Sequence, residues 1–336
     1  MEQHFIDPSR PIAAPSSGFS RTAWAVCLVV AFAAVSGGII VLDSAAPADF
    51  PSGTVVSIEN GLTLDQTAGL LAAKGIIRSA FLYKVYSVFL EGGTTGVKTG
   101  DYLFDAPQSA LRVAYRTARG LEGFPTVKVT IPEGSDSTDM AGVISKAIPG
   151  FDAAGWKKLA APEEGYLFPD TYLWAVNIKP DQAVADMRGV FDTKIRSIGN
   201  DLSAFGKPLK DVVAMASIIE KEATSSADRR IVAGILWKRL SIGMALQVDP
   251  PFYYFLDKRP DQLTLDDLKI ESPYNLYLHT GLPPTPIDSP GLDAIIDTIH
   301  SSTTTPYWFY LSGKDGSMHY ATDLDGHNAN KAKYLN

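Results

Sequence analysis

The sequence has little cysteine and no concentration of positive charge, and both absences narrow its function. Cys27 is the only cysteine in 336 residues, so one chain can form neither an internal disulfide nor a cysteine-based metal site. The chain has 30 Lys and Arg against 37 Asp and Glu, a formal net charge of -7, and no basic block. We therefore expect no nucleic-acid partner.

Short motifs that mark common enzyme classes are also missing. The chain has no GxSxG elbow, HExxH pair, phosphate-binding P-loop or GxGxxG turn. Its 5 histidines lack the spacing of a zinc site, and His319 and His327 suit structural or substrate-facing roles better. We expect neither a metal nor an organic cofactor.

One long segment without charge stands near the N-terminus, from Thr22 to Leu42. At ~1.5 Å per residue, a helix of this length spans roughly 31 Å, the thickness of a bilayer core. The alternative is a cleaved signal peptide, since 44–46 (Ser-Ala-Ala) resembles a cleavage site. The apolar run is longer than a signal peptide requires, so a single transmembrane helix is favoured.

The charges that flank this segment predict its orientation. Arg10 and Arg21 precede it, and no Lys or Arg follows before Lys74. The positive-inside rule then places 1–21 in the cytoplasm and everything from residue 43 outside. The predicted location is the cytoplasmic (inner) membrane, with the large C-terminal part of the chain on its outer side.

A small α+β domain is predicted after a linker at 43–52. Thr63 and Gln66 form a capping box before one of its helices. The predicted order is strand, helix, helix, strand, at Thr54–Ile58, Leu64–Lys74, Ser79–Leu90 and Asp101–Phe104. This plan is that of a LysM-type glycan-binding module, although a plain spacer domain fits the pattern equally well. A helix at Ser109–Arg119 and a strand at Thr126–Ile131 follow, then helices at Thr138–Ile148 and Asp152–Leu159.

We place the domain boundary at residue 130, so that the LysM-like domain covers 53–130 and a mixed α/β catalytic domain covers 131–336. The predicted fold class of the whole chain is α+β.

The segment Asp211–Ala223 reads DVVAMASIIEKEA and predicts a helix with two acidic residues near its end. Its apolar residues recur at helical spacing and form one stripe: Val212, Met215, Ala216, Ile219 and Ala223. Glu220 and Glu222 lie at opposite edges of that stripe, where partial burial would raise a carboxyl pKa. Either could be a general acid, or both could be ordinary boundary residues.

The next helix has a clear start, because Ser225 and Asp228 form a capping-box pattern. Three further segments mix aromatic, acidic, amide and proline residues in expected loops: Glu164–Tyr172, Gln247–Pro250 and 272–284. Such loops place flat rings and amides against sugars, although turn formation alone explains their prolines.

Taken in order, these motifs identify a family. The sequences ASIIEKE, EGYLFPDTY, LQVDP and SPYNLY followed by TGLPP, with a C-terminal YWFY, resemble the MltG-type (YceG-like) endolytic murein transglycosylases. The resemblance covers 45–336. It departs from the family at Val248, where Thr is frequent, at Pro251, and at Tyr320, where Phe is common.

The resemblance implies a peptidoglycan substrate and a lytic reaction. The bond cleaved would be the β-1,4 link between N-acetylmuramic acid and N-acetylglucosamine in nascent strands, with a 1,6-anhydro product. Such an enzyme would end strand growth beside the cell-wall synthases, which are the expected protein partners. The family's catalytic glutamate corresponds to Glu222, with Glu220 as the second choice.

The same resemblance suggests which residues contact the sugar. Asn275, Tyr277 and Gln247 are expected to orient it, whereas Glu164, Asp170 and Asp249 would stabilise charge or hold loops. Tyr166 and Glu220 complete the predicted substrate-binding set. Two alternatives stay open: a lysozyme-like hydrolase with a second carboxylate, and a non-catalytic glycan-binding scaffold for synthases.

Overall fold

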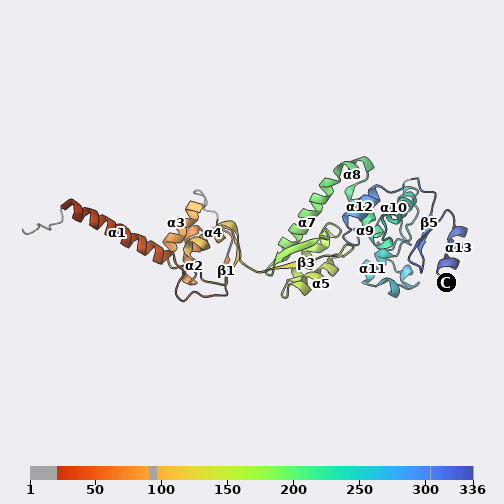
Figure 1. The fold of residues 1–336 in the computed structure, drawn as a ribbon. Coiled ribbons are helices and arrows are strands. Elements are labelled where there is room, and N and C mark those ends of the chain that lie inside the picture. The colour runs from red at the N-terminus through yellow and green to blue at the C-terminus, as the bar shows by residue number, and fades with distance from the viewer. Residues whose placement is uncertain (1–20, 91–96, 303, 336) are drawn as a thin grey trace, which may run out of the picture. The chain divides into compact units, whose positions relative to one another are not determined.

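The computed structural model describes residues 21–90, 97–302 and 304–335, and it divides into two compact units. The first unit ends at Phe124 and the second begins at Pro125 (Figure 1). Helices and short strands occur in both units, which confirms the predicted mixture of the two. Each unit is described by itself below.

The chain enters the first unit through a long apolar helix, α1 (Arg21–Ser44). Its segment Trp24–Ser44 is long and apolar enough to cross a membrane, and none of it is buried against protein. The predicted transmembrane segment Thr22–Leu42 lies entirely within α1. Arg10, which contributed to the predicted orientation, lies outside the described residues.

The rest of the first unit follows the predicted order of strand, helix, helix and strand. Its elements are β1 (Thr54–Ile58), α2 (Leu64–Ala73), α3 (Ala80–Leu90), β2 (Gly100–Phe104) and α4 (Ala110–Arg119). The strands β1 and β2 pair antiparallel, with Val56 opposite Tyr102. The Thr63 and Gln66 capping box is confirmed: the Gln66 backbone N–H donates to the Thr63 hydroxyl at 3.2 Å, and the Thr63 N–H to the Gln66 side chain at 2.8 Å.

One apolar core holds this unit together. The strands contribute Val56 and Phe104, α2 contributes Leu71, and α3 contributes Tyr83, all of them buried. The Tyr83 hydroxyl lies 2.9 Å from that of Thr117 on α4, so the one polar atom that this ring brings into the core has a partner.

The second unit contains most of the helices. Its elements are β3 (Thr126–Thr130), α5 (Ser137–Ala147), α6 (Ala153–Ala160), η1 (Ala161–Glu163), β4 (Thr171–Ala175), α7 (Pro180–Ser197), α8 (Gly199–Phe205), α9 (Leu209–Glu222), α10 (Ser226–Ser241), α11 (Pro250–Leu256), η2 (Pro260–Gln262), η3 (Asp267–Lys269), α12 (Leu292–Ile299), β5 (Phe309–Ser312), β6 (Met318–Ala321) and α13 (Leu324–Tyr334). Strands β3 and β4 pair antiparallel, as do β5 and β6.

The strand β3 belongs to the second unit, although the sequence analysis placed it before the boundary at residue 130. Val129 of β3 lies opposite Tyr172 of β4, and Val129, Tyr172 and Trp156 share one core. The boundary between the two units therefore lies after Phe124. The sheets in the described part of the chain contain only antiparallel pairs.

The helix α9 lies at the centre of the second unit. All eight residues from Val212 to Ile219 are buried, so the predicted apolar stripe is in fact a helix enclosed on every side. Helices α10 and α12 pack against it. Asp297 of α12 links this helix to α10, since its carboxylate accepts hydrogen bonds from Arg229 at 2.9 Å and Arg230 at 2.8 Å.

Candidate functional site

The end of α9 places two acidic side chains in different surroundings. Glu222 is its last residue, and Ala223 leaves the helix with an extended backbone (φ -146°, ψ 141°). Ser225 then caps α10, where its hydroxyl accepts the Asp228 backbone N–H at 3.1 Å. Because Glu220 and Glu222 are about 200° apart around the helix, they face two separate clusters of residues.

Glu222 faces a cluster of tyrosines with one buried arginine. The residue as a whole is half-buried, but its carboxyl group is enclosed by protein atoms. Burial, followed by the negative charge of Asp249, raises the pKa of Glu222 from 4.5 to about 8. The hydroxyl of Tyr310 and the positive charge of Arg239 act in the opposite direction. The carboxyl group is therefore protonated at neutral pH, as a general acid must be.

Asp249 is held beside Glu222 by the start of α11 and by a tyrosine. It occupies the N-cap position of α11, and the Tyr277 hydroxyl donates to its carboxylate at 2.7 Å. Burial, followed by the Asp249 bond and charge, raises the Tyr277 pKa far above its usual value. Tyr253 on the first turn of α11 has its pKa raised to about 12 by burial and by the charges of Asp249 and Glu222.

Arg239 brings a buried positive charge close to Glu222. The residue is 4% exposed, and its guanidinium donates to the Leu246 carbonyl at 2.5 Å and to the Trp308 carbonyl at 2.6 and 3.1 Å. Burial lowers its pKa, and Tyr310 and Glu222 oppose that effect. Because these N–H groups donate to backbone carbonyls, Arg239 fixes the segments at Leu246 and Trp308 and acts on Glu222 through its charge.

Tyr310 approaches Glu222 from the C-terminal hairpin of β5 and β6. It lies opposite Tyr320 in that hairpin. Burial and the charge of Glu222 raise the pKa of Tyr310 well above its usual value, and its hydroxyl hydrogen-bonds to the Glu222 carboxyl. Tyr320 anchors the hairpin to α10, because its hydroxyl donates to the Asp228 carboxylate at 2.5 Å.

Glu220 has structural partners instead. Its carboxylate accepts the Gly291 backbone N–H at 3.0 Å, and it lies 3.9 Å from the Arg229 guanidinium. Burial is the main cause that raises its pKa. These contacts connect the end of α9 to the segment before α12, so Glu220 has a structural role.

The cluster on the Glu220 side contains two more buried acids, Glu164 and Asp288. Glu164 is 2% exposed and accepts the Ser137 hydroxyl at 2.7 Å; burial raises its pKa to about 7. Asp288 is 1% exposed, and burial raises its pKa well above the usual value, partly offset by Lys221. Gly165 has φ 84°, and a Cβ atom there would collide with Pro286, which keeps this residue small.

A model of the YceG-like family matches residues 56–333, which is most of the chain. This chain belongs to the YceG-like family.

Relatives and a solved structure agree with this membership. A protein of Bacillus subtilis named endolytic murein transglycosylase is 27% identical, over 83% of this chain and 84% of its own length. A Streptococcus pneumoniae protein of the same name is 25% identical over 88% of this chain, which spans only 61% of that relative. A crystal structure of a YceG-like protein from Listeria monocytogenes has 26% identity and a TM-score of 0.57, and the alignment covers 83% of this chain and 99% of that one.

Two amide residues of this YceG-like chain were predicted to contact the sugar, and one of them, Asn275, is buried while the other, Gln247, is exposed. Asn275 is fully buried; its side chain donates to the carbonyls of Leu268 and Ile270 at 3.0 and 2.8 Å and accepts the Tyr277 N–H at 3.0 Å. It shapes the loop that carries Tyr277 and has no surface left for a sugar. Gln247 is exposed and has a left-handed backbone, φ 51°, which a residue with a side chain seldom adopts.

The predicted residues from EGYLFPDTY contact other parts of the second unit. Tyr166 packs edge-on against Phe191, with ring centres 5.2 Å apart, and Arg188 lies over its ring. Asp170 is exposed and accepts the Thr171 N–H at 2.7 Å at the start of β4. Together with Glu164, these residues organise the β3–β4 half of the second unit.

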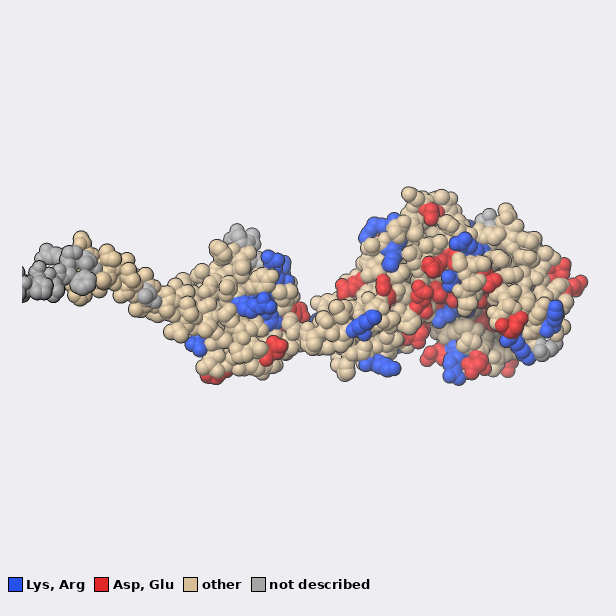
Figure 2. Space-filling model, viewed as in Figure 1, with Lys and Arg blue, Asp and Glu red and all other residues tan. Residues whose placement is uncertain are grey.

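Three residues of the Glu222 cluster were not among the predicted site residues: Arg239, Tyr253 and Tyr310. Tyr310 is the last letter of YWFY, a motif that the resemblance already included. Arg239 had a weaker signal, a basic residue within the apolar spacing of α10. Figure 2 shows Asp and Glu side chains gathered on the visible face of the second unit, so acidity alone does not single out Glu222.

Proposed function

We propose that this chain is a membrane-anchored endolytic murein transglycosylase. Its family membership and its similarity to relatives of that name support action on the glycan strands of peptidoglycan. The observation that carries the assignment is the enclosed Glu222 carboxyl, whose pKa is raised to about 8 beside three tyrosines and Asp249.

The proposed bond is the β-1,4 link from N-acetylmuramic acid to N-acetylglucosamine. Glu222, protonated, donates its proton to the bridging oxygen as that bond breaks. The resulting carboxylate then accepts the proton of the muramic acid C6 hydroxyl, whose oxygen bonds to C1 and closes a 1,6-anhydro ring. Acid and base act in succession, so one carboxyl group is enough and no water is consumed.

The neighbouring residues suit this sequence of proton transfers. The charge of Asp249 keeps the Glu222 proton in place before reaction and would stabilise the positive charge that develops at C1. Tyr277 fixes the direction of the Asp249 carboxylate through its 2.7 Å bond. Tyr310 and Arg239 stabilise the Glu222 carboxylate once the proton has left.

The position of Asp249 also favours one competing function, a hydrolase. A second carboxylate near a general acid can activate water, which is how inverting glycosidases work, or it can attack the sugar as in retaining ones. Glu164, the other acid considered for that role, belongs to the Glu220 cluster. Reducing ends would then replace anhydro ends in the product.

We assign the remaining parts of the chain supporting roles. The helix α1 would hold the protein in the inner membrane, with residues 1–21 in the cytoplasm and both units in the periplasm. The first unit would be a LysM-like module that binds or positions glycan. Cleavage of nascent strands would end their elongation next to the cell-wall synthases.

Mass spectrometry of the products tests the proposed reaction. Full-length protein in detergent would be incubated with uncrosslinked strands. We expect internal fragments that end in anhydromuramic acid, one water lighter than reducing ends. Reducing ends would establish the hydrolase, and intact strands from a folded, membrane-reconstituted protein would favour the non-catalytic scaffold.

A further inference from the structure

The helix α3 carries a row of large apolar side chains that its own unit leaves uncovered. Phe81 is 68% exposed and Phe89 is 82% exposed, and between them Val85 and Val88 are 45% and 42% exposed. Their spacing places all four on one face of the helix, opposite the face that buries Tyr83 in the core. We call these four residues the α3 patch.

The patch lies next to the point where α1 ends. The Tyr86 hydroxyl, on α3, donates to the hydroxyl of Ser44, the last residue of α1, at 3.2 Å. Arg78, just before α3, donates to the Ala46 carbonyl at 2.9 Å. If α1 spans a membrane, these two bonds hold α3 at the surface of that membrane.

The charge of α3 also suits a lipid surface. The helix sequence AFLYKVYSVFL contains no acidic residue and one basic residue, Lys84, which pairs with Asp65. An interfacial helix combines an apolar face with aromatic and basic residues in this way.

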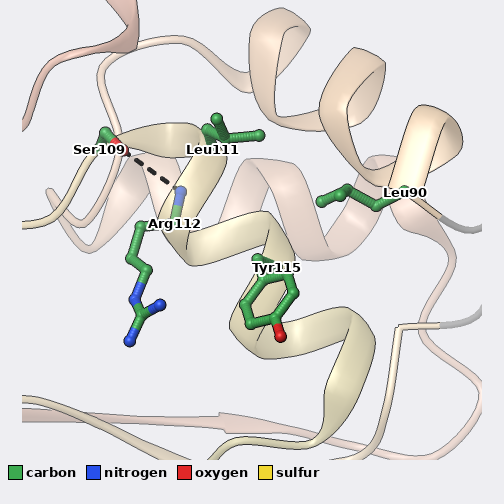
Figure 3. Close-up of a pocket in the computed structure, with 5 residues that line it drawn as sticks. All are labelled: Leu90, Ser109, Leu111, Arg112 and Tyr115. Carbon is green, nitrogen blue, oxygen red and sulfur yellow. Dashed lines mark hydrogen bonds between the residues drawn. The ribbon is translucent and has the colours of Figure 1, made fainter.

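The apolar surface continues from α3 to the start of α4. Leu111 is 45% exposed and, with Leu90, lines a hollow of about 370 Å³ between the two helices. Figure 3 shows Leu90 and Leu111 facing this gap, which Ser109, Arg112 and Tyr115 also line. The hollow belongs to the first unit, far in sequence from Glu222.

We propose that the α3 patch lies in the membrane that holds α1, with its phenylalanines at the boundary between headgroups and acyl chains. The proposal rests on the membrane anchor of the proposed function. Two contacts, α1 through the bilayer and α3 along its surface, would fix the orientation of the first unit. The helix that carries the patch is bonded through Tyr86 to the last residue of the anchor, and this position favours lipid as the occupant over a soluble partner.

Single-cysteine labelling of the full-length chain tests this, because Cys27 is the only native cysteine and lies on α1. An environment-sensitive fluorophore would be attached to Cys27, or, in a Cys27→Ser background, to Val88→Cys or Glu59→Cys. Glu59 is an exposed residue outside the patch. Protein would be reconstituted in vesicles of phosphatidylethanolamine and phosphatidylglycerol, with and without lipids carrying an acyl-chain nitroxide quencher.

We expect the labels at 27 and 88 to be quenched by the nitroxide lipid, each at least about twofold more than the label at 59, because both would contact acyl chains. Adding Phe81→Ser and Phe89→Ser should return the label at 88 to the level at 59 and leave the label at 27 unchanged. Both residues are exposed, so folding should persist.

Each contrary result has one meaning. Quenching at 27 but not at 88 overturns the patch proposal while the anchor stands, and a protein partner becomes the better occupant. Absence of quenching at 27 contradicts the anchor itself. Equal quenching at 88 with and without the phenylalanines would show that the patch does not cause the contact.

Discussion

The C-terminal end of α9 carries two glutamates, Glu220 and Glu222, whose surroundings differ. On one side, Glu220 accepts a backbone N–H and lies beside Arg229, so its carboxylate ties segments of the fold together. On the other, Glu222 faces Tyr310 and Asp249, and its raised pKa keeps a proton available. The two glutamates are only two positions apart, but the helix turns them toward different neighbours. Glu220 therefore holds segments of the fold together, whereas Glu222 keeps a proton that it could donate.

The largest expected difference between the two sides is in activity. Glu222→Gln keeps the shape of the side chain but removes its proton transfer, so we expect the cleavage rate to fall by about 100- to 10,000-fold. Glu220→Gln is the matched control and should stay within about threefold, since an amide oxygen can still accept the Gly291 N–H. Turnover of uncrosslinked strands measures both. Equal losses, or a larger loss at Glu220, would reverse the assignment.

A second effect should follow from the bond between Tyr277 and Asp249. Tyr277→Phe removes a hydrogen bond to a charged group, which contributes about 1.5–3 kcal/mol, so the rate should fall roughly 10- to 100-fold. Tyr274→Phe removes a comparable hydroxyl, bonded to Thr285 at 2.8 Å on the other side of the loop. Its rate should be close to that of the wild type; if the two variants behaved alike, the specific role of Asp249 would be lost.

The Glu220 side should respond in stability instead. Glu220→Ala leaves the Gly291 N–H without its acceptor, and we expect the free energy of unfolding to fall by about 1–3 kcal/mol. Thermal or urea denaturation measures this loss. Activity at low temperature should be nearly unchanged. A variant that unfolded normally but lost its activity would show that Glu220 takes part in the chemistry.

The smallest effect is on the pH dependence of stability. The pKa of Glu222 is raised from 4.5 to about 8 in the folded protein, so the folded state holds a proton that the unfolded chain releases between those values. The unfolding free energy must therefore fall as pH rises through this window. Glu222→Gln should therefore raise the melting temperature at pH 8 by several degrees, with little change at pH 4.5.

Asp297 provides the opposite case and a control for this prediction. Burial acts to raise its pKa, but bonds from Ser226, Arg229 and Arg230 lower it overall. Its contribution to stability is present at neutral pH and is lost as pH falls through the folded pKa. Asp297→Asn should thus destabilise the protein at pH 8. If Glu222→Gln and Asp297→Asn changed the melting temperature in the same direction at pH 8, the opposite pKa shifts of Glu222 and Asp297 would be contradicted.

Much of the fold was predictable because its signals are local. The capping box at Thr63, the N-cap at Ser225 and the apolar periodicity of α2, α9 and α10 each depend on residues within one or two turns of a helix. The pairing of β3 with β4 joins distant parts of the chain, so nothing near residue 130 indicated that β3 belongs to the second unit.

The candidate site was predictable in part, for a similar reason. Glu222, Asp249 and Tyr277 come from motifs, and the structure brings them together. Arg239 was missed because a basic residue among the apolar positions of a helix usually points to solvent, and only the carbonyls of Leu246 and Trp308 explain its burial. The sequence predicted Asn275 as a sugar contact, whereas its hydrogen bonds to the carbonyls of Leu268 and Ile270 show that it supports the loop.

The central claim is that Glu222 holds a proton at neutral pH and gives it to the glycosidic oxygen. The pH dependence of kcat/KM for the full-length enzyme tests this most directly, because it reports the pKa of the acid in the free enzyme. We predict a rate that declines above pH 8, the pKa to which Glu222 is raised, and that this limb disappears in Glu222→Gln along with the activity. A rate that stays constant through this region, or a Glu222→Gln enzyme that retains both rate and limb, would contradict the account.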